Sequence, residues 1–214
     1  MSENIVTKEG LIKKTFDPFE ETTLIEMDRY ESFGYGSATI QVSVAKVDSK
    51  KGEQFLLRFK AGGSGGDNRH VYGSAVMEKV IIACDDVTNI NLNIDYGGSP
   101  STSNRVSDKG DITYYADNTG QADISLKQLK TICEANNIEA RYYGGIGYLD
   151  TKDGFEAKLK RVCRVFYSNV VEPGAYDSDV KQLHTTVGRE KLIKLILWVL
   201  LGVGILWVLS KCAG

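Results

Sequence analysis

Histidine, proline and closely spaced cysteine are scarce in this chain of 214 residues. It contains two histidines, three prolines and four cysteines. His70 and His184 lack the His-x-x-x-His and His-x-Cys spacings of metal sites, and no two cysteines form a Cys-x-x-Cys pair. These absences exclude the usual sequence signatures of zinc and dithiol redox sites. We therefore predict neither a metal nor a cofactor, and we expect the cysteines to be small buried hydrophobic residues.

The chain also lacks the features of a secreted protein. Its first ten residues, MSENIVTKEG, contain no apolar signal-peptide core. No Asn-x-Ser/Thr glycosylation acceptor occurs, and scattered thiols are typical of a reducing compartment. We therefore expect the polar part of the chain to lie in the cytosol.

An excess of positive charge is absent as well. The formal net charge is −2. Residues 189–214 carry +3, which leaves −5 on residues 1–188. Because binding to DNA or RNA depends on neutralising phosphates with cationic side chains, this distribution disfavours nucleic acid as a partner.

The sequence does contain a long apolar run near its C-terminal end. The fifteen residues Leu195–Leu209 carry no charge, and extension back to Leu192 gives eighteen residues that include only Lys194. Eighteen helical residues cover about 27 Å at a rise of ~1.5 Å, close to the ~30 Å thickness of a bilayer core. A buried helix of a soluble fold normally keeps one polar face, and this run has none. We predict a transmembrane helix at 191–210 and a short tail at 211–214, with a buried helix or an oligomer core as the alternative.

The residues that flank this run predict its orientation. More positive charge precedes the run than follows it, which places the N-terminal body in the cytosol by the positive-inside rule. The lysine inside the run lies within one turn of its end, so its ammonium can reach the interface. The predicted membrane-interface residues are Arg189, Lys191, Lys194, Trp198, Trp207 and Lys211. The pattern is that of a single-pass tail anchor.

The first ~125 residues have the two-residue periodicity of β-strands. Residues 38–44 alternate apolar and polar side chains, and the polar turn VDSKKGE joins them to a second alternating stretch, 54–61. Together these stretches predict an antiparallel hairpin. The further predicted strands, two of them weaker, are 80–84, 90–96, 112–116, 11–16 and 22–27.

The periodicity then becomes helical. Ser125 and Gln128 form a capping-box pattern before an apolar stripe, which predicts a helix at about 125–136. Residues 138–150 predict a strand, a Gly-Gly bend and a short return, and a stronger amphipathic stripe predicts a second helix at about 154–168.

These elements together predict the fold class. We expect a mainly β body at 1–171, an antiparallel sandwich or partly closed sheet, with two amphipathic helices near its C-terminal end and α+β as the alternative. A polar tether at 172–190 would join it to the membrane helix. Regular β-α-β alternation is absent, which argues against a parallel sheet.

The glycine-rich stretch GGSGG, residues 62–66, resembles a phosphate-binding loop only superficially. Such a loop ends in Gly-Lys-Ser/Thr before a helix, whereas here Asp67 to His70 follow. We predict a hairpin loop with a strand after it, and His70 as a surface loop residue that could serve in binding. The acidic groups near 108–123 lack the spacing of a calcium loop and fit ordinary turns.

An aromatic hairpin is the strongest candidate for a binding surface. Tyrosine and arginine are the residue types enriched where proteins bind partners. The candidates are Arg141, Tyr142, Tyr143 and Tyr148. The plainer interpretation is that these tyrosines edge the sheet with their hydroxyls in water. The basic residues of the second helix, 158–164, could face anionic lipid or simply water.

We therefore derive three functional hypotheses from the sequence. The leading one is a tail-anchored adaptor, scaffold or sensor whose cytosolic domain binds a protein partner or small ligand. The second is a membrane-associated hydrolase that uses carboxylates and His70. The third is a membrane-perturbing effector activated by self-association. The expected partners are the lipid bilayer and a protein, which could be a second copy of the chain.

The apolar run generates a direct prediction. We expect the full chain to sediment with membranes when a detergent-free lysate is ultracentrifuged, because a helix without a polar face is more stable among acyl chains than in water. Recovery of the chain in the supernatant as a monodisperse monomer would contradict the anchor.

Overall fold

The computed structural model describes residues 5–6, 12–27, 31–35, 38–85, 87–145, 147–150 and 155–179. The chain divides into two compact units, 1–175 and 176–214. Of the second unit, only 176–179 are described. Within the described residues, no helix combines the length and apolar character needed to cross a bilayer. The predicted membrane helix at 191–210 and its interface residues lie outside the described residues.

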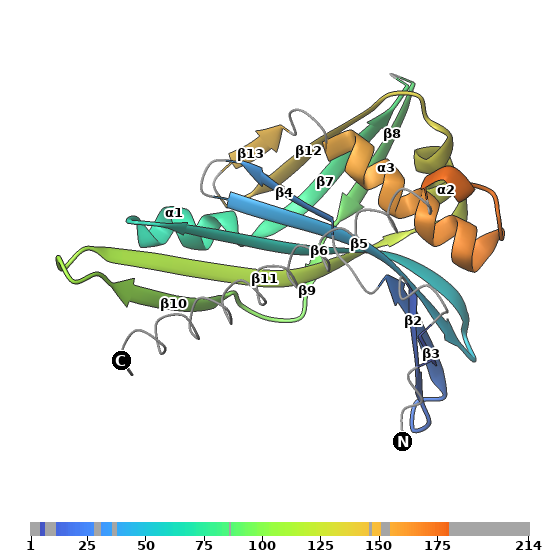
Figure 1. Cartoon of the computed structure of the whole chain (residues 1–214), viewed down its shortest axis with the longest axis horizontal. Coiled ribbons are helices and arrows are strands. Elements are labelled where there is room, and N and C mark those ends of the chain that lie inside the picture. The colour runs from blue at the N-terminus through green and yellow to red at the C-terminus, as the bar shows by residue number, and fades with distance from the viewer. Residues whose placement is uncertain are drawn as a thin grey trace, which may run out of the picture. The chain divides into compact units, whose positions relative to one another are not determined.

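A nine-stranded antiparallel sheet forms the larger layer of the first unit and curls into a half-barrel (Figure 1). Its order is β1-β2-β3-β5-β6-β11-β10, with β4 paired to β5 and β9 paired to β11. The strands are β1 (Ile5–Val6), β2 (Ile12–Asp17), β3 (Thr22–Met27), β4 (Glu31–Tyr35), β5 (Ala38–Ser49), β6 (Gly52–Gly65), β9 (Asp95–Tyr96), β10 (Ser101–Val106) and β11 (Ile112–Ile124).

A four-stranded antiparallel sheet forms the smaller layer, in the order β13-β12-β7-β8. Its strands are β7 (Met77–Cys84), β8 (Thr88–Asn93), β12 (Ile138–Gly144) and β13 (Gly147–Asp150). The two sheets meet through buried rings, because Phe59 of β6 and Tyr142 of β12 make an edge-to-face contact with centroids 5.9 Å apart. The small sheet therefore has one inner face, packed against the large sheet, and one outer face.

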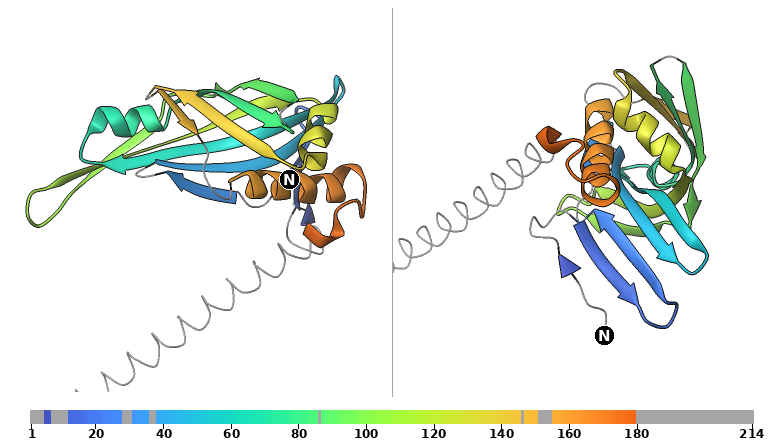
Figure 2. Two further views of the ribbon diagram at one scale, coloured as in Figure 1. Left: turned by 90° about the horizontal axis from the view of Figure 1, so that it is seen from above. Right: turned by 90° about the vertical axis from the view of Figure 1, so that its right-hand side faces the viewer.

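The described residues of the first unit also form three α-helices: α1 (Asn68–Ser74), α2 (Leu126–Glu134) and α3 (Phe155–Phe166). A π-helical turn, Tyr167–Val171, continues α3. Figure 2 shows α2 and α3 side by side at one end of the sheets. α3 packs against α2, β5 and β12, and its residues Leu159, Val162 and Phe166 are fully buried. This helix thus fills the space between the two sheets.

The structure confirms the mainly β, antiparallel body and its two C-terminal helices. The predicted hairpin is β5 and β6, with Ser49 opposite Gly52 at the turn. The predicted capping box is present at α2, where Ser125 Oγ accepts from Gln128 N and Gln128 Oε1 accepts from Ser125 N. The α3 cations are only partly exposed, since Lys158, Arg161 and Arg164 are half-buried and Arg164 Nε donates to Cys133 O.

The prediction for GGSGG is wrong. Residues 62–65 continue β6 and pair with β11, and helix α1 follows instead of a strand. Asp67 caps this helix by accepting from Arg69 N. A Cβ on Gly63 would collide with Ser74 of α1, so this glycine serves close packing of a helix on a strand and not the freedom of a loop. His70 accordingly lies on α1, where it is exposed.

Close packing at a second glycine gives a stability test. A Cβ on Gly144 would collide with the backbone carbonyl oxygen of Val76, whereas no heavy atom lies within 4 Å of a Cβ on Gly98. We expect Gly144→Ala to lower the free energy of unfolding by about 2 kcal/mol or more, because the backbone must shift to remove the clash. Gly98→Ala is the matched control and should change stability by less than about 0.5 kcal/mol. Equal melting temperatures for the two variants would contradict the close approach.

Candidate binding face

Strict alternation along β7 separates the inner and outer faces of the small sheet. Val80, Ile82 and Cys84 are buried, whereas Ile81 and Ala83 between them are half-buried. β12 alternates in the same way, with Ile138, Ala140 and Tyr142 buried and Glu139 and Arg141 exposed. Because side chains of a strand point to alternate faces, Ile81, Ala83, Glu139 and Arg141 share the outer face.

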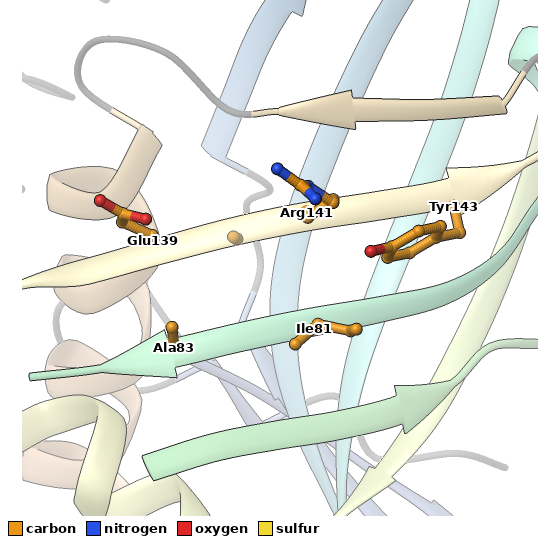
Figure 3. A pocket seen from close by; sticks show the side chains of 6 residues that line it. Ile81, Ala83, Glu139, Arg141 and Tyr143 are labelled. Atoms are coloured by element: carbon orange, nitrogen blue, oxygen red, sulfur yellow. The ribbon is translucent and has the colours of Figure 1, made fainter. Parts of the chain in front are cut away.

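An open pocket of about 260 Å³ lies on this outer face. It is lined by Ile81, Ala83, Glu139, Ala140, Arg141 and Tyr143. Glu139 stands opposite Ala83 in the strand register and Arg141 opposite Ile81. Figure 3 shows the Glu139, Arg141 and Tyr143 side chains along β12 beside the shorter Ile81 and Ala83 on β7. The pocket thus combines an apolar floor with one anion, one cation and one aromatic ring.

β8 extends this face on one side, and β13 pairs with β12 on the other. On β8, Asn89, Asn91 and Asn93 are exposed, and their register partners on β7 are Ala83, Ile81 and Lys79. On the other side, Tyr148 of β13 stands opposite Tyr143, and Asp150 opposite Arg141. We call this surface the outer-face site. Its residues are Lys79, Ile81 and Ala83 of β7, Asn89, Asn91 and Asn93 of β8, and Glu139, Arg141 and Tyr143 of β12. It offers amide, aliphatic, aromatic and charged groups on one surface.

The structure brings together some of the predicted site residues and separates others. Arg141 and Tyr143 both line the pocket, and Tyr148 stands opposite Tyr143 in register. Tyr142 is not available to a partner, because it is 1% exposed and its ring packs on Phe59. Two adjacent strand residues cannot face the same side, so one of the Tyr-Tyr pair had to be in the core. His70, on α1, is not among the residues that line the pocket.

Sequence reasoning missed Ile81, Ala83 and Glu139. The run Val80–Cys84 is continuously apolar, a pattern typical of a strand with both faces covered. This pattern could have indicated that the outer face of β7 is also covered. In the described part of the chain, the outer sides of Ile81 and Ala83 are only half covered, so the apolar surface left there fits an external partner.

Asp85, an acidic residue next to this face, has a structural role. Asp85, which follows β7, accepts hydrogen bonds at Oδ1 from the backbone N–H groups of Asn136 and Asn137, both at 2.8 Å. It adopts a positive φ of 52° at this turn and thereby joins β7 to the start of β12. Among the described residues, no group of three or more His, Cys, Asp or Glu side chains could hold a metal ion.

Burial disfavours ionisation of the titratable groups behind the face. Burial raises the pKa of the Tyr142 hydroxyl and of the Cys163 thiol well above their ordinary values. Burial also raises the pKa of Tyr96 to about 12, and its hydroxyl accepts from Met77 N at 3.1 Å. This bond links β9 of the large sheet to β7 of the small sheet, and both strands belong to the platform behind the outer-face site.

The buried thiols allow a test of this platform. Cys84, Cys133 and Cys163 are each at most 2% exposed, and thiols react as thiolates. In a Cys212→Ser variant we expect all three to react with an aromatic disulfide reagent at pH 8 about a thousandfold more slowly in the folded chain than in denaturant, because reaction requires opening of the core. One rapidly reacting thiol in the folded variant would contradict the packing around that cysteine.

No protein-family model, curated protein or solved structure matches this chain. Its function is therefore inferred from its own residues and geometry. Within the described part of the chain, the outer-face site combines varied exposed side chains with a buried core behind them and is the best candidate for binding.

Proposed function

We propose that this chain is a tail-anchored membrane protein whose β-rich domain binds a protein partner through the outer-face site. The observation that carries the proposal is the open pocket in which Arg141 and Tyr143 stand beside the apolar pair Ile81 and Ala83. Arginine and tyrosine are enriched among the residues that dominate binding energy, especially where they surround a well-packed apolar contact.

The size of the pocket favours a protein over a small ligand. Its volume of about 260 Å³ lies below the roughly 300–1,000 Å³ of typical small-molecule sites, which enclose most of their ligand. An open pocket of this size fits one side chain of a partner that extends over the neighbouring strands. The asparagines of β8 and the charged residues of β12 would then form the polar rim of the contact.

The charges of the site define what the partner should present. Glu139 and Arg141 are two residues apart on β12 and share the outer face. A complementary partner would place an apolar side chain over Ile81 and Ala83, with a cation near Glu139 and an anion near Arg141. Reversal of one of these charges leaves a like-charge pair in the complex and should weaken it.

The predicted anchor at 191–210 explains how a small contact could suffice. Confinement of the domain to a membrane surface raises its effective concentration toward partners on the same membrane. The membrane location rests on the apolar run of the sequence, and the sedimentation experiment described above tests it separately from partner binding.

Photo-cross-linking in cells tests the binding face. The full chain would carry a photoreactive amino acid at position 143, with position 60 on the exposed side of β6 as the matched control. We expect a discrete cross-linked protein from position 143 only. Its yield should fall about tenfold, or roughly 1.4 kcal/mol, in an Arg141→Glu or Ile81→Asp background, and should be unchanged by Lys60→Glu.

Two results would contradict the proposal. One is equal cross-linking from positions 143 and 60. The other is a cross-link from position 143 that Arg141→Glu and Ile81→Asp leave unchanged while the melting temperature of each variant matches that of the parent chain.

A further inference from the structure

The strand β10 forms one edge of the large sheet, and all six of its residues are exposed. It pairs with β11 on one side without a bulge, from Ser101 opposite Asp117 to Val106 opposite Ile112. The hairpin that it forms with β11 projects beyond the rest of the sheet (Figures 1 and 2). In the described part of the chain, no strand pairs with the other side of β10.

This edge lacks the devices that usually prevent strands from pairing between molecules. Proteins protect exposed edges with proline, lysine, bulges or very short strands. β10 reads STSNRV, so Arg105 is its only charged residue and its proline, Pro100, precedes the strand. Val106, Ile112 and Tyr115 are 59%, 45% and 41% exposed. The edge is therefore long enough, and uncharged enough, to accept another strand.

The positions of two charges on the hairpin indicate which strand that is. Arg105 stands opposite Thr113, and Asp117 stands opposite Ser101. Within one molecule the two charges are four positions apart along the strands, or about 13 Å at 3.3 Å per residue, too far for an ion pair. Both side chains are exposed, and among the described residues neither has an ion pair of its own.

We propose that β10 pairs antiparallel with β10 of a second copy of this chain, with Ser103 opposite Ser103 on the two-fold axis. In this register Arg105 stands opposite Ser101 of the second copy, and Asp117 of that copy is the next residue across the sheet. The two charges are then in one row, with their backbones about 10 Å apart across two strand spacings. A long arginine side chain can cross the short serine to reach the carboxylate.

Neighbouring registers do not provide this complementarity. If the axis passed through Asn104, Arg105 would stand opposite Ser103 of the second copy, whose neighbour across the sheet is Tyr115. The serine-centred register makes two symmetric Arg105–Asp117 pairs, because a two-fold contact repeats each interaction. In this register the free edge of each β10 is paired with the other copy. The assembly therefore stops at two copies and does not grow into a fibre.

The contact is small, and we expect it to be reversible. Six residues a side is well below the roughly 20–30 residues a side of a stable interface. Salt should weaken it further, because the two ion pairs are exposed.

Cysteine cross-linking tests the register. In the full chain, carrying Cys212→Ser and kept in detergent micelles if it requires them, Ser103→Cys places two thiols directly opposite each other. Opposite residues of antiparallel strands have Cα atoms about 4.5–5.5 Å apart, within the range for a disulfide. With a mild oxidant we expect Ser103→Cys to form covalent dimers at least tenfold faster than the matched control Asp123→Cys on the same hairpin. Mixed Thr102→Cys and Asn104→Cys chains should cross-link to each other, because these positions are opposite in this register.

A charge exchange tests the recognition itself. Arg105→Glu and Asp117→Lys should each reduce the dimer yield of Ser103→Cys at least fivefold, and the double exchange should restore it to within twofold. Lys109→Glu, at the hairpin turn, should have no effect. The proposal is overturned if Ser103→Cys cross-links no faster than Asp123→Cys, or if the double exchange recovers nothing while all variants keep the parent melting temperature. Arg105→Glu should not alter photo-cross-linking from position 143. The proposals for the outer-face site and for the β10 edge are therefore tested independently of each other.

Discussion

The contact between the two sheets is the constraint on which the rest of the structure depends. Phe59 and Tyr142 meet edge to face, and the fully buried residues of α3 occupy the space beside them. Each sheet has one mainly apolar inner face, and neither sheet can bury that face without the other. The hydrogen bond from Met77 N to the Tyr96 hydroxyl then fixes the small sheet against the large one. Both candidate surfaces, the outer-face site and the β10 edge, are what this packing leaves exposed.

The two surfaces use different physical properties of a β-sheet. The outer-face site uses side chains, because the alternation that buries Ile82 presents Ile81 and Arg141 outward. The edge of β10 uses backbone groups, with side-chain charges that select the register. A single-pass anchor, if present, would favour both, because it confines copies and partners to one layer.

Local sequence signals predicted the local structure well. The capping box of α2 and the β5–β6 hairpin depend on residues close together in the chain, and both are present. Failures occurred where a distant segment decides the outcome. Gly63 reads as a loop residue until α1 is placed against it. Of the six residues that line the pocket, the sequence predicted Arg141 and Tyr143, whereas Ile81, Ala83 and Glu139 required knowledge that β7 and β12 are neighbours.

The order of strands along the chain has a consequence for how the molecule unfolds. β6 and β11 are neighbours in the large sheet, yet the segment between them supplies both β7 and β8 of the small sheet. Neither sheet is a contiguous piece of sequence, so neither can be excised or melt as a separate module. Unfolding of the 1–175 unit should then be all-or-none, and occupancy at either surface should slow hydrogen exchange, by the same free energy, at those backbone amides of the unit that exchange only through global unfolding.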